Sequence, residues 1–535
     1  MVEVRQIEDR GSLLPQAAAG IGTLGLFSWL IYEWAAQPFY SLITTFLFAP
    51  FFANSFVGDP VAGQSYWGYA AAAAGLAVAI LSPLLGAFAD AAGHRKRWIV
   101  IALIIFMAGM SSLWLADPGQ PGRLIWILLA FIVAAVAAEV SATFVNAMMP
   151  GLVAPEHYGR LSGTSAALGY LGGLCALLIV AGLLVGDAGS GKTLLGLTPL
   201  LSLDAVSRQG DRLVGPFCAL WLLIFALPML LFTPDRQVAR TQSGLDGLKQ
   251  TFGELQHHKD IILFLVSRML FTDGLLAMFS FGGIYGTALF GWSTTELGLF
   301  GIVLIVAAMF GAAIGGTLDD RIGPKAVIIG SLVIAFFAAA GVVSVDRTHV
   351  LFAQTVAEKV PGSGFLASSA ERWFLLFTIF VGLVTGPLGA SSRSLMARLA
   401  PKDRITQFFG LFAFSGKASS FVAPLLVGGL TAATGEQRWG LAVVLVFLAA
   451  GLIMMPMVRG DRDPNEEALM GAQGRGANRS VGAAMVDPDE FRRARVPRDV
   501  DQGHGDTASL IGWIVVGALF LASLAVIVLS AVLGR

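Results

Sequence analysis

The sequence predicts an all-α polytopic membrane protein with two six-helix halves plus one extra C-terminal transmembrane helix. Three observations lead to this fold class. The chain is 56% hydrophobic and 13% charged, which is more apolar surface than a soluble protein of 535 residues can bury. Apolar runs near the length that a helix needs to cross a bilayer recur along the chain. One short loop pattern occurs twice, once in each half.

The predicted helices follow these apolar runs in order. We expect spans at 21–53, 66–89, 97–116, 122–149, 160–186, 214–233, 260–290, 296–318, 325–345, 372–399, 405–434, 438–458 and 509–533. The first and the seventh are long enough to tilt or break. A polar stretch at 234–259 divides the first half (1–233) from the second (260–458), and its segment 245–255 is predicted to form a short surface helix. The tail at 459–507 lacks the apolar content to fold alone, and 508–535 holds the extra helix.

Lysine and arginine predict the orientation. They gather in one set of short loops, whereas the opposite short loops 54–65 and 291–295 contain none. Short loops rich in these residues stay on the cytoplasmic side of a membrane. We therefore expect the N-terminus inside and the lipid bilayer as the main partner.

A tight turn between the second and third predicted helices carries the most informative pattern. The first copy is Gly86, Asp90, Gly93 and Arg95, and the second is Gly316, Asp320, Arg321 and Gly323. The first glycine lets two helices approach, and the aspartate can sit against the positive end of a neighbouring helix. The second glycine permits a sharp reversal, and the cations hold the loop at the cytoplasmic face. A single copy is equally well read as an ordinary cytoplasmic loop; two copies in corresponding places favour a gating role.

Polar residues inside the spans are the candidates for a substrate or proton pathway, because ionisable groups are costly there. In the first helix, Glu33, Gln37 and Tyr40 share one face with Thr44, beside the backbone break expected at Pro38. The alternative is a polar seam for helix packing. The other candidates are Glu139, Asn146, Asp273 and Lys417. A lysine at that depth needs a carboxylate partner, for which Glu33, Glu139 and Asp273 are all open, and Arg268 is predicted to pair with Asp273 or with another carboxylate.

Several classes of function are not expected. The formal net charge is zero, so no basic field indicates nucleic acid. Cys175 and Cys218 lie in apolar runs, so we expect no metal and no cofactor. No nucleophile–base pair indicates an enzyme. Residues 186–193 match the phosphate-loop pattern, but that mechanism needs a strand before the loop, and here a membrane helix precedes it.

The duplicated loop resembles the signature loop of the major facilitator superfamily. The chain is also similar to the vacuole-effluxer branch of that superfamily, in segments that together extend over most of residues 25–458. These segments are Trp29–Phe39, Phe271–Gly274, Phe281–Tyr285, Gly386–Pro401 and Phe408–Lys417. The fourth contains Arg393, which we group with the gating residues. The resemblance implies the major facilitator fold and, from the branch's eukaryotic members, amino-acid efflux.

The function expected from these observations is secondary active transport of a small polar metabolite, an amino acid first, by alternating access. A proton could be carried by Glu33 or Asp273, because desolvation favours the protonated form of a carboxyl group. The expected location is the inner (plasma) membrane of a bacterium. The alternative is a non-transporting membrane scaffold or assembly subunit, whose extra C-terminal helix would bind a protein partner.

Overall fold

The computed structural model describes residues 22–459 with gaps. The gaps are 93, 187–190, 194, 202, 205–206, 236–258, 293, 361–363 and 402–403. Several predicted features therefore lie outside the described residues: Gly93 of the first signature loop, most of the linker with its surface helix, part of the segment 186–193, the tail and the thirteenth helix. These features stay predictions.

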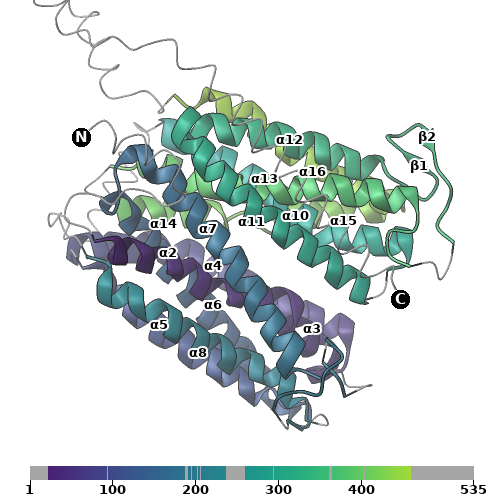
Figure 1. The fold of residues 1–535 in the computed structure, drawn as a ribbon, viewed down its shortest axis with the longest axis horizontal. Coiled ribbons are helices and arrows are strands. Elements are labelled where there is room, and N and C mark those ends of the chain that lie inside the picture. Colours follow the sequence, from purple (N-terminus) through teal and green to yellow (C-terminus); the bar gives the residue numbers. More distant parts are fainter. Residues whose placement is uncertain are drawn as a thin grey trace, which may run out of the picture. The chain divides into compact units, whose positions relative to one another are not determined.

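The first half of the described chain is a bundle of membrane-length helical segments (Figure 1). Its elements are α2 (Thr23–Pro38), continued by η2 (Phe39–Phe46), α3 (Phe48–Phe51) and η3 (Phe52–Phe56), then α4 (Pro60–Ala92), α5 (Arg95–Ser112), α6 (Leu124–Met148), α7 (Tyr158–Ile179) and α8 (Gln209–Phe232). Single turns extend some of these helices: η4 (Leu113–Leu115), η5 (Pro121–Arg123), η6 (Met149–Gly151), η7 (Pro155–His157) and η8 (Val180–Leu184).

The second half repeats this arrangement. Its elements are α10 (Lys259–Phe290), α11 (Thr294–Ile322), α12 (Pro324–Ser344), α13 (Ser369–Leu399), α14 (Ile405–Ser415), α15 (Val422–Thr434), α16 (Gln437–Met454) and η9 (Met455–Met457). A short antiparallel hairpin of β1 (His349–Val350) and β2 (Gln354–Thr355) lies in the loop after α12. Local sequence sets the helix starts: Pro324 begins α12 after a glycine, and Ser368 and Glu371 form a capping box at α13.

Eleven helical segments of the described chain are long and apolar enough to cross a membrane. They coincide with predicted spans to within a few residues at most ends. The predicted span 405–434 is different, because it is broken into α14 and α15 around Gly416–Phe421. The first span changes from α- to π-helical geometry directly after Pro38, as a proline in a helix can cause. The seventh, α10, is unbroken.

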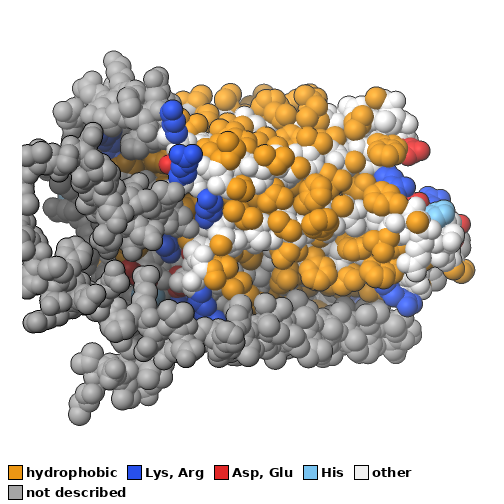
Figure 2. All heavy atoms as spheres, turned by 90° about the horizontal axis from the view of Figure 1, so that it is seen from above, with side chains coloured by type: hydrophobic (Ala, Val, Ile, Leu, Met, Phe, Trp, Pro, Cys, Tyr) orange, Lys and Arg blue, Asp and Glu red, His pale blue; other side chains and the backbone are white. Residues whose placement is uncertain are grey.

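The halves meet through few helix pairs. Helix α7 packs against α11 and α13, and α14 packs against α4 and α6. The outer part of the broken helix, α15, packs against α10 and α16 of its own half. We call the end of the bundle that carries Asp90 and Asp320 the signature face, and the end that carries the β-hairpin the opposite face. Figure 2 shows a broad apolar band with lysine and arginine gathered at its two edges.

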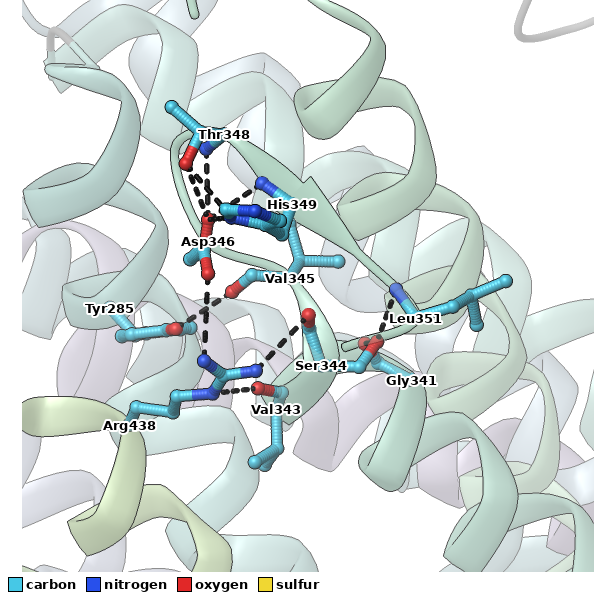
Figure 3. Close-up of polar contacts among 10 residues, drawn as sticks. All are labelled: Tyr285, Gly341, Val343, Ser344, Val345, Asp346, Thr348, His349, Leu351 and Arg438. Atoms are coloured by element: carbon cyan, nitrogen blue, oxygen red, sulfur yellow. Dashed lines mark hydrogen bonds and ion pairs between the residues drawn. The ribbon is translucent and has the colours of Figure 1, made fainter. Parts of the chain in front are cut away.

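An arginine ties two helices together at the opposite face of the second half (Figure 3). The Arg438 Nε at the start of α16 donates to the Val343 carbonyl at the end of α12, 2.8 Å away. Its guanidinium lies 3.5 Å from the Asp346 carboxylate. Asp346 in turn accepts a hydrogen bond from the Thr348 amide at 2.8 Å. Tyr285 of α10 donates to the Val345 carbonyl at 2.8 Å, so three helices converge on this loop.

We call this arrangement of an arginine, a carbonyl group and an aspartate a clamp, and the first half contains a second one. The Arg212 Nε near the start of α8 donates to the Trp114 carbonyl at 2.8 Å, and its guanidinium lies 3.5 Å from Asp117. Asp117 accepts from the amide of Gly119, again two residues later. The aspartate follows the carbonyl residue by three positions in both copies. The two halves therefore repeat each other at the opposite face as well as at the signature face.

Candidate functional site

The first signature loop contacts the second half directly. The Asp90 carboxylate accepts a hydrogen bond from the amide of Gln407 at 2.9 Å, in the first turn of α14. Arg95 is 6% exposed; its guanidinium lies 3.5 Å from Asp90 and its Nε donates to the Thr406 hydroxyl at 2.8 Å. We had expected this cation at the membrane surface. It is instead buried between the halves, where the Asp90 carboxylate supplies the opposite charge and the Thr406 hydroxyl accepts from its Nε.

The second signature loop makes the corresponding contact with the first half. The Asp320 carboxylate accepts from the amide of Arg160 at 3.1 Å, in the first turn of α7, and from its Nε at 2.7 Å. Gly323 has a φ of +83°, a backbone conformation that glycine adopts without strain, and this permits the predicted reversal. Arg321 is exposed and contributes nothing to this contact. Each aspartate thus lies at the N-terminus of a helix of the other half, where the helix dipole favours a negative charge.

The first glycine of each loop makes these contacts possible. A Cβ atom on Gly86 would lie 2.8 Å from the Thr406 carbonyl oxygen, and one on Gly316 would lie 2.6 Å from the Gly159 carbonyl oxygen. A larger residue at either position would push α4 from α14 or α11 from α7.

Arg393 of α13 lies deeper between the halves and pairs with Glu33 of α2. The same guanidinium lies 3.5 Å from the Asn146 side-chain oxygen on α6 and donates to the Ser162 carbonyl on α7 at 3.1 Å. Three helices of the first half therefore converge on one arginine of the second. The sequence placed Glu33 inside a span and grouped Arg393 with the gating residues, but it did not pair them.

Lys417 forms the second deep ion pair between the halves. Its ammonium lies 2.9 Å from the Glu139 carboxylate on α6, which identifies one of the three partners that the sequence left open. Lys417 stands in the non-helical segment between α14 and α15. Because the helix is broken at this point, the Lys417 side chain reaches α6, and the ion pair depends on the break.

Glu33 and Gln37 of the first helix lie at its contact with α7. A Cβ on Gly169 would lie 3.3 Å from Glu33, and one on Gly173 would lie 2.8 Å from the Gln37 side chain. The Tyr40 carbonyl accepts hydrogen bonds from the Thr44 hydroxyl at 2.6 Å and from the Thr45 hydroxyl at 2.9 Å. Thr44 is therefore turned to its own backbone.

The predicted pairing of Arg268 with a carboxylate is wrong. Its NH1 donates to the Phe412 carbonyl and the Ser415 hydroxyl of α14, each at 2.7 Å, and the guanidinium stacks 3.6 Å from the Phe412 ring centroid. The C-terminal end of α14, where the helix breaks, offers this arginine carbonyl oxygens and a negative dipole. Asp273 is buried, and neither of its oxygens has a hydrogen-bond partner among the described residues.

The sequence analysis missed Asp319, which is 0% exposed. It accepts from the Ser394 hydroxyl at 3.1 Å and lies 3.7 Å from Arg398, both on α13. A Cβ on Gly159 of α7 would lie 2.4 Å from the Asp319 side chain. The position of Asp319 directly before the signature aspartate Asp320 is the feature of the sequence that could have singled it out. Two adjacent acids at the end of α11 thus serve two different helices.

Known proteins resemble this chain in sequence and in fold. A family model described as "Vacuole effluxer Atg22 like" matches residues 52–468. The uncharacterized MFS-type transporter YxiO of Bacillus subtilis (strain 168) is 24% identical over 440 residues, which are 81% of this chain and 94% of that protein. Autophagy-related protein 22 of Cryptococcus neoformans var. neoformans serotype D (strain B-3501A) is 25% identical over 320 residues, 57% of this chain and 54% of that protein. The chain thus spans about half the length of the fungal relatives that it matches.

Solved structures share the fold. The major facilitator superfamily transporter FucP in its outward conformation has a TM-score of 0.60 and 15% sequence identity, covering 82% of this chain and 98% of FucP. A bacterial homologue of the iron transporter ferroportin in an outward-facing state has the same TM-score, identity and coverage. At these identities the likeness shows the fold alone, which is the major facilitator fold.

Proposed function

Since the chain belongs to the family of Atg22-like vacuole effluxers, we propose that it is a secondary active transporter that moves a small polar metabolite, an amino acid first, by alternating access. One observation carries this proposal: every ion pair found between the described parts of the two halves lies at the signature face or in the deep layer of Glu33 and Glu139. Such contacts are a gate, because opening the signature face requires all of them to separate together.

The deep layer supports a zwitterionic substrate. Two carboxylates of the first half face two cations of the second, in the pairs Glu33–Arg393 and Glu139–Lys417. An α-amino acid carries one group of each charge, so it can replace the partner on both sides as the pairs part. Neutral sugars offer no such exchange. Leaving a buried charge without a partner is costly, so the substrate would stabilise the intermediate in which the gate opens.

The broken helix indicates which face of the bundle is closed in this conformation. Its inner part, α14, is attached to α4 and α6 of the first half, whereas α15 stays with its own half. The signature face is therefore the closed one in this conformation. A coupling ion would be carried by an acid within the spans.

Transport by purified protein in liposomes tests the proposal. We expect saturable uptake of at least one amino acid in counterflow, and loss of uptake in Arg393→Gln. Arg347→Gln is the matched control, because Arg347 is exposed and bonds to Ala288 at the opposite face. Failure of amino acids, peptides and sugars to be transported or to raise the thermal stability of the folded protein would instead favour the scaffold alternative.

We also propose that the signature face is cytoplasmic, with the N-terminus inside a bacterial inner membrane. The asymmetry of lysine and arginine between the short loops supports this orientation. A single cysteine at Gly119, which lies in the opposite-face loop after α5, should react with an impermeant maleimide in intact cells. A cysteine at Arg321 should react only after the cells are opened. The reverse pattern would invert the topology.

A further inference from the structure

Asp273 is a buried carboxyl group that the gate does not use. It is 1% exposed, and neither oxygen has a hydrogen-bond partner among the described residues. The Ser419 hydroxyl lies near it without a hydrogen bond of normal geometry. Ser419 belongs to the break between α14 and α15. An ionised carboxylate is not stable in such a place, whereas a neutral carboxylic acid is.

The charged groups around Asp273 are already committed elsewhere. Arg268, five residues earlier on α10, is held by Phe412 and Ser415 of α14. Lys417 of the break is paired with Glu139, and Arg393 of α13 with Glu33. Arg438 is the one charged residue in the sequence of α16, and it lies at the opposite face. Next to Asp273, Gly274 packs against Phe447 and Leu448 of that helix.

We propose that Asp273 is the binding site of the coupling ion, that this ion is a proton, and that Arg268 is the positioning residue that expels it. This inference rests on the transport function proposed above and assigns its coupling to one residue. In the present conformation the proton sits on the Asp273 carboxyl group. Glu33, the other acid considered, belongs to the gate because it is paired with Arg393.

The helix that holds Arg268 is also the helix that closes the gate. The Gln407 amide of α14 donates a hydrogen bond to the Asp90 carboxylate, and the helix packs against α4 and α6. When the signature face opens, α14 separates from the first half and its end at Ser415 moves. Arg268 is then free to turn toward Asp273, and the carboxyl group gives its proton to water as the ion pair forms. The proton is gained from water on one side and lost to water on the other.

Infrared difference spectroscopy tests this without a substrate. The stretching band of a protonated carboxyl group should appear in the difference between the wild-type protein and Asp273→Asn at neutral pH, in buffer containing choline chloride. Arg268→Gln should raise the pH at which this band disappears by about one unit, because it removes the opposing charge. Ser415→Ala, which removes one anchor of Arg268, should lower that pH. Glu33→Gln should leave the band in place.

Two results would overturn the inference. If the wild-type and Asp273→Asn proteins show no difference in this band, Asp273 is ionised and holds no proton. If sodium chloride abolishes the band at constant pH, the site binds a metal cation. Neither result bears on whether the protein transports, which the liposome assay decides separately; conversely, a protein that shows the band but transports nothing contradicts the proposed function alone.

Discussion

At the scale of single residues, the central feature is that charges are placed in pairs that join the two halves. Arg393 reaches three helices of the first half, and Glu33 is its ionic partner. Both side chains are largely but not completely buried. Removing one partner leaves the other charge in a poorly solvated place, whereas removing both does not.

A double-mutant cycle measures this pair. We expect Glu33→Gln and Arg393→Gln each to destabilise the conformation closed at the signature face, and the double variant to lose less than the sum. A coupling free energy of about 1 kcal/mol is expected for residues in direct contact. The measurement is the accessibility of cysteine probes at the signature face of the purified protein. Strict additivity would mean that the pair contributes nothing to the closed state.

The clamp at the opposite face predicts a pH dependence. Burial works to raise the pKa of Asp346, but hydrogen bonds from the Thr348 and His349 amides and the contact with His349 outweigh it, so the pKa is lowered. A carboxyl group whose folded pKa is depressed stabilises the fold above its ordinary pKa. That stabilisation is lost as the pH falls below about 4 and through the folded value.

The difference in melting temperature between the wild-type protein and Asp346→Asn, followed from pH 7 downward, checks this. We expect the wild type to be the more stable at pH 7 and the difference to shrink as the pH falls through this range. A difference that grows on acidification would contradict the assignment.

At the scale of helices, close approach decides which contacts can form. Helix α4 crosses α14 where Gly86 and Gly410 lie, and α7 crosses α11 where Gly163 and Gly316 lie. Each crossing brings backbone atoms together, as small residues do in membrane helices. The two aspartates of the signature loops can reach the helix ends of the other half because of this proximity.

Gly86→Ala should open the signature face. Its added Cβ meets a carbonyl oxygen rather than a movable side chain, and overpacking of this kind costs about 1–3 kcal/mol. Gly75→Ala on the same helix is the control, since nothing lies within 4 Å of a Cβ there. Labelling of a cysteine introduced near the gate should rise in the first variant only. Equal labelling in both would remove Gly86 from the gate.

The two helix caps make a paired prediction. Asp90→Asn and Asp320→Asn keep the shape of the side chain but remove the charge at the N-terminus of α14 or α7. Each should shift the equilibrium between closed and open states by on the order of 1 kcal/mol toward opening of the signature face. Accessibility of cysteine probes on both faces measures the shift. Unchanged accessibility in both variants would show that the charges do not hold the gate.

At the scale of the described bundle, corresponding contacts recur in the two halves. The signature loops repeat at one face, and the clamps of Arg212 and Arg438 repeat at the other. The loop contacts run between the halves, whereas each clamp stays within its own half. In the mechanism proposed above, the contacts between the halves would break during transport, whereas the clamps would keep each half rigid.

Variants of the clamps should therefore change stability and not the access equilibrium. Arg212→Gln and Arg438→Gln each remove charge-assisted hydrogen bonds, worth about 1–3 kcal/mol, and their effects should add because no partner is shared. Melting temperature and cysteine accessibility measured on the same samples separate the two effects. A change in accessibility without loss of stability would place the clamps in the gate.

The class of fold, most helix limits to within a few residues, and the charged residues within the spans can all be predicted from the amino-acid sequence. Each span must be apolar and long enough to cross the bilayer, whatever its neighbours are, so composition and the length of apolar runs reveal the spans one by one. The duplicated loop is likewise a local pattern of a few residues, so it reveals the two halves without knowledge of how they pack. Glu33, Glu139, Asp273 and Lys417 stood out because a charge within an apolar run is rare.

Only the tertiary structure decided how those charges pair. Glu33 and Arg393 are 360 residues apart, and no periodicity connects them. The break at Gly416–Phe421 was not predicted either, because apolar runs flank it and its short polar stretch of Gly416, Lys417, Ser419 and Ser420 is also compatible with a continuous helix. Tertiary packing sets these features: Arg268 donates to the Phe412 carbonyl and the Ser415 hydroxyl, and Lys417 pairs with Glu139. Asp273 has no hydrogen-bond partner among the described residues, because the cations around it are already bound.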